Sequence, residues 1–144
     1  MINSNFRALL LLVTIGCLSC GRTREFPLSH TTQLSRLDEY QPPASIKLTE
    51  LEILKVTSGL KKYLSTNQPT IAQEFPKYYF QLIGYQSQGQ SIVLVNAFHE
   101  AELRDSPDWQ TKPILVKGGG EQYWKARYSL TTDSVIECWV NAEK

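Results

Sequence analysis

Residues 78–98 read YYFQLIGYQSQGQSIVLVNAF, and this stretch decides the expected fold. Its two halves, residues 78–85 and 91–98, are rich in aromatic and β-branched side chains, which favour strands. Between them, Ser87-Gln88-Gly89-Gln90 supplies a turn that contains a glycine. Two strand-like runs separated by such a turn predict a β-hairpin, and therefore an antiparallel sheet.

A helix is predicted upstream of this hairpin. Thr49 and Glu52 form a T-x-x-E capping box, in which each side chain accepts a hydrogen bond from the backbone of the other residue. Gly59 disfavours a helix interior, so we expect it to mark close packing against the sheet. Asn67 and Pro69 end the segment. The apolar stripe of this helix consists of Ile53, Val56, Leu60, Tyr63 and Leu64.

A second hairpin is predicted downstream, after a long polar connection over residues 99–113. Side chains alternate along residues 122–130, so that one face carries Trp124, Ala126, Tyr128 and Leu130 and the other carries Tyr123, Lys125, Arg127 and Ser129. A turn over residues 131–134 leads to a last strand over residues 135–141, with Ile136, Cys138 and Val140 expected on one face. One helix followed by four antiparallel strands predicts an α+β fold of the cystatin-like type, with a small NTF2-like cone as the alternative.

The N-terminus has the layout of a bacterial export signal. Arg7 precedes the apolar run ALLLLVTI at residues 8–15, and small residues follow around Cys17 and Cys20. The run is too short to span a bilayer, which needs about 20 apolar residues. We predict a lipoprotein-type signal region over residues 1–21, with fatty acyl chains such as palmitate on Cys17 or, alternatively, on Cys20. Free secretion after cleavage before Arg22 and an uncleaved anchor stay open.

Residues 22–46 are polar and contain three prolines, so we predict a flexible tether there and a single folded domain over residues 47–144. Removal of residues 1–16 takes away one charge, that of Arg7, and leaves 14 basic and 14 acidic side chains. This balance argues against a nucleic-acid partner, and against electrostatic membrane binding beyond the lipid itself. Cys138 is then the only cysteine of the domain, and we expect it to be a buried small hydrophobe.

No motif in the sequence predicts catalysis, a metal or a cofactor. His99-Glu100 lacks the second histidine of H-E-x-x-H, because Leu103 stands in its place. Residues 118–120 are three glycines that could present backbone N–H groups to an anion, but no Lys-Ser/Thr follows them as in a phosphate loop. We therefore expect a bulge or kink at that point, and a protein that is not an enzyme.

Aromatic and basic side chains offer the best candidates for partner binding. Tyr123, Lys125 and Arg127 share the face of their strand that is expected to point away from the helix. Trp109 lies in the long 99–113 connection. A mixed aromatic and charged surface of this kind is typical of protein interfaces. We predict these four residues as possible partner-binding positions.

The second half of the chain resembles a group of small exported bacterial proteins of unknown function. The resemblance covers residues 78–143 and rests on Val95-Asn96-Ala97-Phe98, Trp109, Val116-Lys117-Gly118-Gly119-Gly120, Tyr128 and Trp139-Val140-Asn141-Ala142-Glu143. That group has an Asp where Gly118 stands and cysteines where His99 and Gln122 stand, so the disulfide implied for the group is missing here. The resemblance implies an exported, cystatin-like protein without enzymatic activity.

Three function classes follow from these observations. The first is an envelope-exported, lipid-anchored protein that binds a protein or envelope ligand through its sheet face or its 99–113 loop. The second is an inhibitor of an exported protease, although residues 86–90 and 131–134 lack the Gln-x-Val-x-Gly and Pro-Trp hairpins of cystatin inhibitors. The third is an NTF2-like protein with a small-ligand pocket, which requires a deep polar cavity between helix and sheet.

Overall fold

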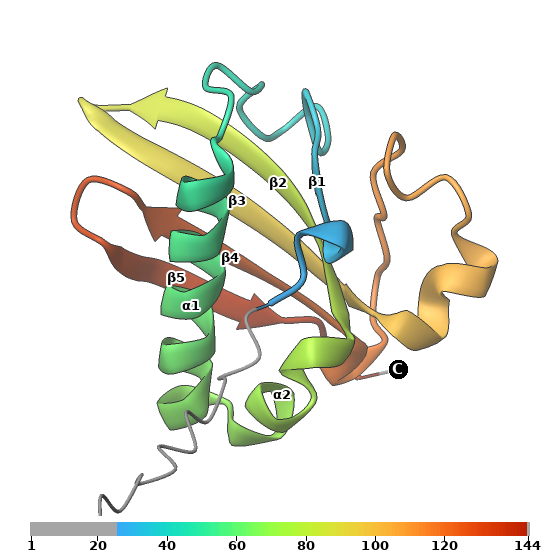
Figure 1. Cartoon of the computed structure of the whole chain (residues 1–144). Helices are drawn as coiled ribbons and strands as arrows, with labels where there is room; N and C mark the ends of the chain where they lie inside the picture. The colour runs from blue at the N-terminus through green and yellow to red at the C-terminus, as the bar shows by residue number, and fades with distance from the viewer. Residues whose placement is uncertain (1–25, 144) are drawn as a thin grey trace, which may run out of the picture.

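The computed structural model describes residues 26–143 and has an α+β fold, in which one long helix lies across one face of a single sheet (Figure 1). Within these residues no helix is both long and apolar enough to cross a membrane. The helical elements are η1 (Leu28–His30), α1 (Glu50–Asn67), α2 (Pro69–Gln73), η2 (Phe75–Lys77), η3 (Glu100–Asp105) and η4 (Gly120–Gln122). The strands are β1 (Thr31–Gln33), β2 (Tyr78–Ser87), β3 (Gln90–His99), β4 (Tyr123–Ser129) and β5 (Ser134–Val140).

The sheet contains five strands in the order β1-β2-β3-β4-β5. Strands β2 to β5 are antiparallel to their neighbours, so both predicted hairpins are confirmed. The expected number of four strands is wrong, because β1 pairs in parallel with β2, with Thr31 opposite Phe80. Gln33 fixes this strand by exchanging two side-chain hydrogen bonds with the backbone of Leu48. Three residues are too few for an alternating pattern to appear in the sequence. Strand β1 is therefore recognised only from its pairing with β2 and its contacts with Leu48.

The predicted helix is confirmed, including its start. Thr49 is the N-cap of α1, its backbone N–H donates to Glu52 Oε2 at 2.8 Å, and the Glu52 N–H donates to Thr49 Oγ1 at 3.3 Å. Gly59 packs closely against the sheet as expected, because a Cβ atom at this position would lie 2.5 Å from Cε2 of Tyr128. Glycine therefore lets the helix approach the Tyr128 ring.

The main core lies between α1 and the sheet. The alternation predicted for β4 is confirmed, since Trp124, Ala126 and Tyr128 are almost completely buried on the helix side. On α1, Val56, Leu60 and Leu64 are fully buried against them. The side chains that fill this space are mainly apolar. The described residues therefore do not favour the deep polar cavity that an NTF2-like protein requires.

Residues 26–46 pack on the sheet and do not form the expected tether. The Phe26 ring stacks on Phe80 with 4.6 Å between ring centroids. Leu34 and Leu37 are buried on the face of the sheet that points away from α1. Ile46 forms a β-bridge with Gly84 before the chain enters the helix. Phe26, Leu34 and Leu37 of this polar segment pack against the sheet, which composition alone does not reveal.

Strand β5 departs from regular alternation. Arg127 pairs with Glu137, but the next residue of β4, Tyr128, pairs with Val135, so Ile136 is an extra residue in a β-bulge. The prediction that Ile136 shares a face with Cys138 and Val140 is therefore wrong. Val135 packs against the core in its place, and Ile136 is 45% exposed.

Candidate functional site

The outer face of the sheet, which points away from α1, is divided into covered and open parts. One covered part is held by a buried polar network around Gln81 and Asn96. The Gln81 amide donates to the carbonyls of Trp109 and Lys112 at 2.6 and 2.7 Å. The Gln81 carbonyl oxygen accepts from Asn96 and from the backbone N–H of Ile114, both at 2.9 Å. This network fastens the long connection across β2 and β3.

A second covered part of the outer face lies on β2 and β3 toward the turn that joins them. Leu34 and Leu37 pack there against Ile83, Tyr85 and Leu94, among other side chains of the outer face. All five of these side chains are buried. One segment that precedes β2 and one that follows β3 in the chain therefore cover the outer face of these two strands.

The outer face of β4 and β5 stays open. Lys125 lies opposite Trp139, and Arg127 lies opposite Glu137, in register across the two strands. We call these four residues the open sheet face. Trp139 is 36% exposed, and the Arg127 and Glu137 side chains are 39% and 44% exposed. In the view of Figure 1, α1 lies in front of the sheet, so the open sheet face is on the far side.

Charges within the open sheet face are partly neutralised. Arg127 Nε lies 2.5 Å from Glu137 Oε1, in an ion pair whose angle departs from that of a good hydrogen bond. This carboxylate raises the pKa of Arg127 above its already high ordinary value. The pair lies on the same face of β4 and β5 as Lys125 and Trp139, so this face carries an aromatic ring together with charges of both signs.

A second group of apolar side chains borders the open sheet face. Leu115 and Val116 are 53% and 36% exposed. Asn141 follows β5 and donates to the carbonyls of Val116 and Gly118 at 2.8 and 3.0 Å, which brings this segment beside the end of β5. The open surface is therefore larger than the four residues that define it.

Of the four predicted partner-binding residues, Lys125 and Arg127 lie in the open sheet face and Tyr123 lies at its border. Tyr123 is half-buried, and a Cβ atom on Gly119 would come within 2.6 Å of its ring. Burial, followed by a hydrogen bond to the Glu102 carboxylate, raises the pKa of Tyr123. Its phenol is thus engaged with the 99–113 connection. Gly119 has a positive φ of 87° and precedes η4, so the three glycines form a turn before β4.

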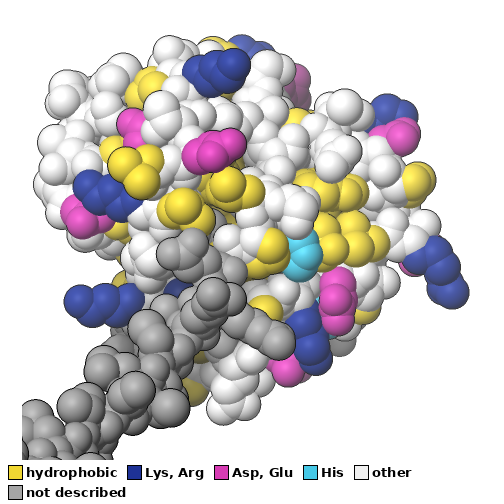
Figure 2. Space-filling view, viewed as in Figure 1, with side chains coloured by type: hydrophobic (Ala, Val, Ile, Leu, Met, Phe, Trp, Pro, Cys, Tyr) yellow, Lys and Arg dark blue, Asp and Glu magenta, His cyan; other side chains and the backbone are white. Residues whose placement is uncertain are grey.

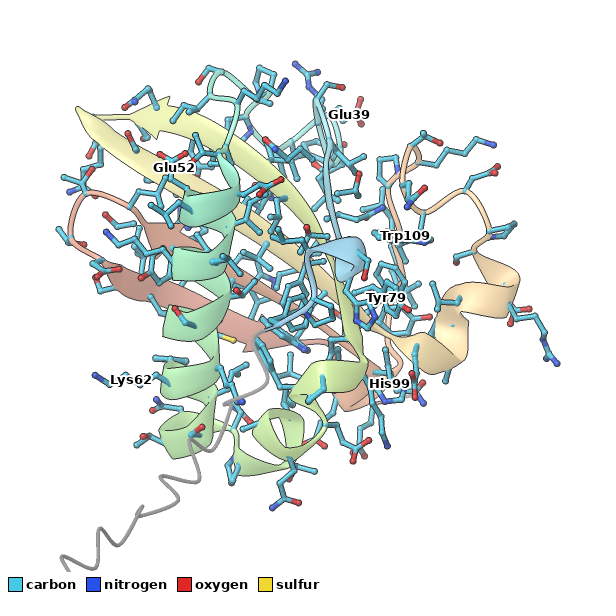
Figure 3. The ribbon with its side chains drawn as sticks, viewed as in Figure 1. Glu39, Glu52, Lys62, Tyr79, His99 and Trp109 are labelled. Carbon is cyan, nitrogen blue, oxygen red and sulfur yellow. The ribbon has the colours of Figure 1, made fainter. Side chains whose placement is uncertain are left out.

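Trp109 is buried and does not belong to this surface. Its ring contacts Tyr79 at 5.1 Å and Phe98 at 5.7 Å between centroids, both in edge-to-face arrangements. Figure 3 shows Trp109 and Tyr79 side by side, with His99 at the end of β3. Trp109 therefore anchors the 99–113 connection to the sheet.

Trp139 and Glu137 are the two residues of the open sheet face that the sequence prediction missed, and Trp139 is the aromatic one. It alternates with Cys138 and Val140, which were expected to share a face, so the same alternation places Trp139 on the other side of β5. Cys138 is half-buried on the helix side, and burial raises the pKa of its thiol to about 11. The thiol is protonated at neutral pH, which agrees with a packing role.

The histidine considered for a metal or acid–base site, His99, makes contacts that hold the fold. His99 Nδ1 accepts from the N–H of Ala101 at 3.2 Å and thereby caps η3, and His99 Nε2 lies 3.6 Å from Glu74 Oε2. Residues 26–143 contain no cluster of three or more His, Cys, Asp or Glu side chains that could hold a metal ion. The open sheet face carries an aromatic ring and charges, which suit binding.

Cys17, Cys20 and the rest of the predicted signal region lie outside the described residues. No family model, curated protein or solved structure matches this chain.

Proposed function

We propose that this protein is exported to the bacterial cell envelope, is anchored there by lipid on Cys17 or Cys20, and binds a protein partner without acting as an enzyme. The predicted export signal and the cysteines at its end support export to the envelope and lipid anchoring there. The open sheet face supports the binding role, and it is the observation that carries the proposal. Segments 34–46 and 106–117 cover the outer face of β2 and β3, whereas β4 and β5 are left uncovered.

The side chains of the open sheet face suit a protein surface. The Trp139 ring supplies apolar area, and aromatic and arginine side chains contribute most strongly to protein interfaces. Lys125 and the Arg127–Glu137 pair surround it with charges of both signs, which select a partner by complementary charge. Trp109, by contrast, is buried, so the proposal assigns the contact to β4 and β5.

Site-specific photo-crosslinking in membranes of an expressing bacterium tests this function. A photo-reactive amino acid at Lys125 should give a discrete adduct with a protein, and Trp139→Ala should remove that adduct. Glu39 is an exposed position over the covered part of the sheet and serves as the matched control site. No adduct at Lys125, or the same adduct at Glu39, would contradict the proposal.

The proposed anchor has its own measurement, the intact mass of the mature protein extracted from membranes. A mass matching residues 17–144 or 20–144 plus lipid is the expected result, and it also identifies the cysteine. An unlipidated chain that starts near Arg22 would overturn the anchor and leave the binding role to be tested separately.

The proposed architecture is a cystatin-like arrangement, supported by one helix followed by four antiparallel strands in chain order. One observation favours protease inhibition as a second candidate function. The two hairpin turns lie together, since Leu130 N–H donates to Ser91 O and Ser91 N–H donates to Thr131 Oγ1. Assays against a panel of exported proteases test this candidate, and absence of inhibition at micromolar concentration would end it.

A further inference from the structure

The packed part of the chain begins close to the proposed anchor. Phe26 stacks on Phe80 and also contacts Phe75 edge-on at 5.3 Å between centroids, so it belongs to the folded domain. Phe26 lies nine positions after Cys17 and six positions after Cys20 in the sequence. Even fully extended, nine residues reach only about 30 Å. An anchor on either cysteine would therefore hold the domain within about its own diameter of the membrane.

The surface beside Phe26 is the outward face of α1. A hollow lined by Phe26 and Phe75 continues along this helix past Lys62, Lys61 and Leu51. Leu51 is 77% exposed, although it is a large apolar side chain. Figure 2 shows hydrophobic side chains at the surface on the face of the molecule that carries α1, with basic and acidic side chains among them. In Figure 3, Lys62 projects away from the sheet.

The charge of this surface is locally positive beside Phe26. Lys61 and Lys62 are exposed, and neither makes an ion pair within the part of the chain that the structure describes. Lys55 lies nearly two helical turns before Lys62 and 3.5 Å from Asp133. The Glu52 carboxylate, at the other end of the hollow, accepts hydrogen bonds from Thr49 in the capping box. The charge of the whole protein is nearly balanced, but the C-terminal half of α1 carries two lysines without an ion pair among the described residues.

We infer that the outward face of α1 docks on anionic phospholipid headgroups, with Lys61 and Lys62 as the electrostatic contacts and Leu51 as an apolar contact. This inference rests on the lipid anchor of the proposed function. The short segment before Phe26 keeps the domain within about 30 Å of the membrane. The lysines can therefore come within about a Debye length of the headgroups, 8–10 Å, where attraction to an anionic surface acts. Because α1 and the open sheet face lie on opposite sides of the sheet, the docked domain presents the open sheet face away from the membrane.

Short-range fluorescence quenching tests the inference on the full lipidated chain. An environment-sensitive fluorescent amino acid replaces Ser58, an exposed residue of α1, and in a matched control it replaces Lys125. The vesicles contain phosphatidylcholine with a nitroxide on the headgroup and about 30% phosphatidylglycerol, which supplies the anionic surface. We expect quenching at Ser58 and little at Lys125. Vesicles without phosphatidylglycerol should give weaker quenching at Ser58.

The double variant Lys61→Glu/Lys62→Glu separates docking from anchoring. Loss of two lysine contacts alone should lower the ratio of docked to undocked domain about 30-fold, and the two new carboxylates add repulsion. Quenching at Ser58 is therefore lost, while the chain still floats with the vesicles. Unchanged quenching in the variant, or equal quenching at Ser58 and Lys125, overturns the inference and leaves the anchor intact. A chain that fails to float with the vesicles overturns the anchor itself.

Discussion

The two faces of the sheet are covered in different ways. Helix α1 packs its apolar stripe against the inner face, α2 and η2 add Ile71 and Phe75 beside it, and these residues form one continuous core with the strands. On the outer face, two irregular segments cover β2 and β3, one through Leu34 and Leu37 and the other through hydrogen bonds to Gln81. The rest of the outer face is open. Local sequence pattern therefore specifies the helix stripe and strand alternation of the inner face, whereas contacts between distant segments specify the cover of the outer one.

The largest expected effect comes from replacing a tryptophan by alanine on each face of the sheet and comparing the two losses of stability. Trp124→Ala removes a completely buried side chain from the inner face and should lower the free energy of unfolding by about 3–5 kcal/mol. Trp139→Ala on the outer face of the neighbouring strand should cost less than about 1 kcal/mol. Urea denaturation of the two variants measures both values. Similar losses would mean that the two faces do not differ in the way described.

A smaller effect is expected from the polar network of the outer face. Gln81→Leu leaves the Ile114 N–H and the carbonyls of Trp109 and Lys112 without their partner, at a cost of about 1–3 kcal/mol. The amide of Ile114 should also lose protection from hydrogen exchange. Gln86→Leu is the control, because the exposed Gln86 side chain makes one hydrogen bond, from Nε2 to Ser91 Oγ, and its replacement should change stability by less than about 0.5 kcal/mol.

The close approach of α1 to the inner face gives the next prediction. Gly59→Ala should destabilise the protein by about 1–3 kcal/mol through overpacking against Tyr128, although alanine favours helices. Ser58→Ala, one position away and exposed, should be neutral or slightly stabilising. Thermal and urea unfolding compare the two variants. A stabilised Gly59→Ala protein would show that the helix can move away from the sheet at no cost.

The smallest effect is a pH dependence at the edge of the inner face. The Tyr128 hydroxyl donates to Asp133, and this hydrogen bond, together with Lys55, lowers the pKa of the Asp133 carboxyl. Its stabilising contribution is therefore complete above the unfolded pKa of about 3.9 and is lost as the pH falls through the lower folded value. Asp133→Asn should flatten this acid dependence, as measured by urea midpoints between about pH 5 and pH 2.

The variant Asp133→Asn keeps the backbone geometry, because Asp133 has a positive φ of 54° and asparagine tolerates this conformation well. An acid dependence equal to that of the unmodified protein would show that the Tyr128–Asp133 bond contributes nothing to folding. Loss of stability at neutral pH with a flattened profile would agree with the assignment.

Much of the inner face could be predicted from the sequence. The capping box at Thr49 and Glu52, the apolar stripe of α1 and the alternation of β4 are local patterns with a fixed period. Gly59 was also informative, since a glycine in a helix interior needs a packing reason. These features depend on neighbours within a few residues, so a single sequence contains them.

The outer face and its site could be predicted only in part. Lys125 and Arg127 were found by alternation, whereas Trp139 was missed although the same rule places it beside them. Trp109 was expected at the surface but is buried under contacts from Tyr79 and Phe98, which lie far from it in sequence. Strand β1 and the packing of Leu34 depend on β2 in the same way. Long-range pairing of this kind leaves no periodic signal.

The bulge at Ile136 has a consequence for the solubility of the protein. β5 is an edge strand of seven residues, and an exposed apolar edge of this kind is a template for pairing with other chains. The extra residue interrupts the regular spacing of backbone donors and acceptors and increases the local twist. A foreign strand therefore cannot continue the sheet in register past Ile136. The outer face of β4 and β5 can therefore expose Trp139, while the bulge in the edge strand β5 disfavours pairing with strands of other chains.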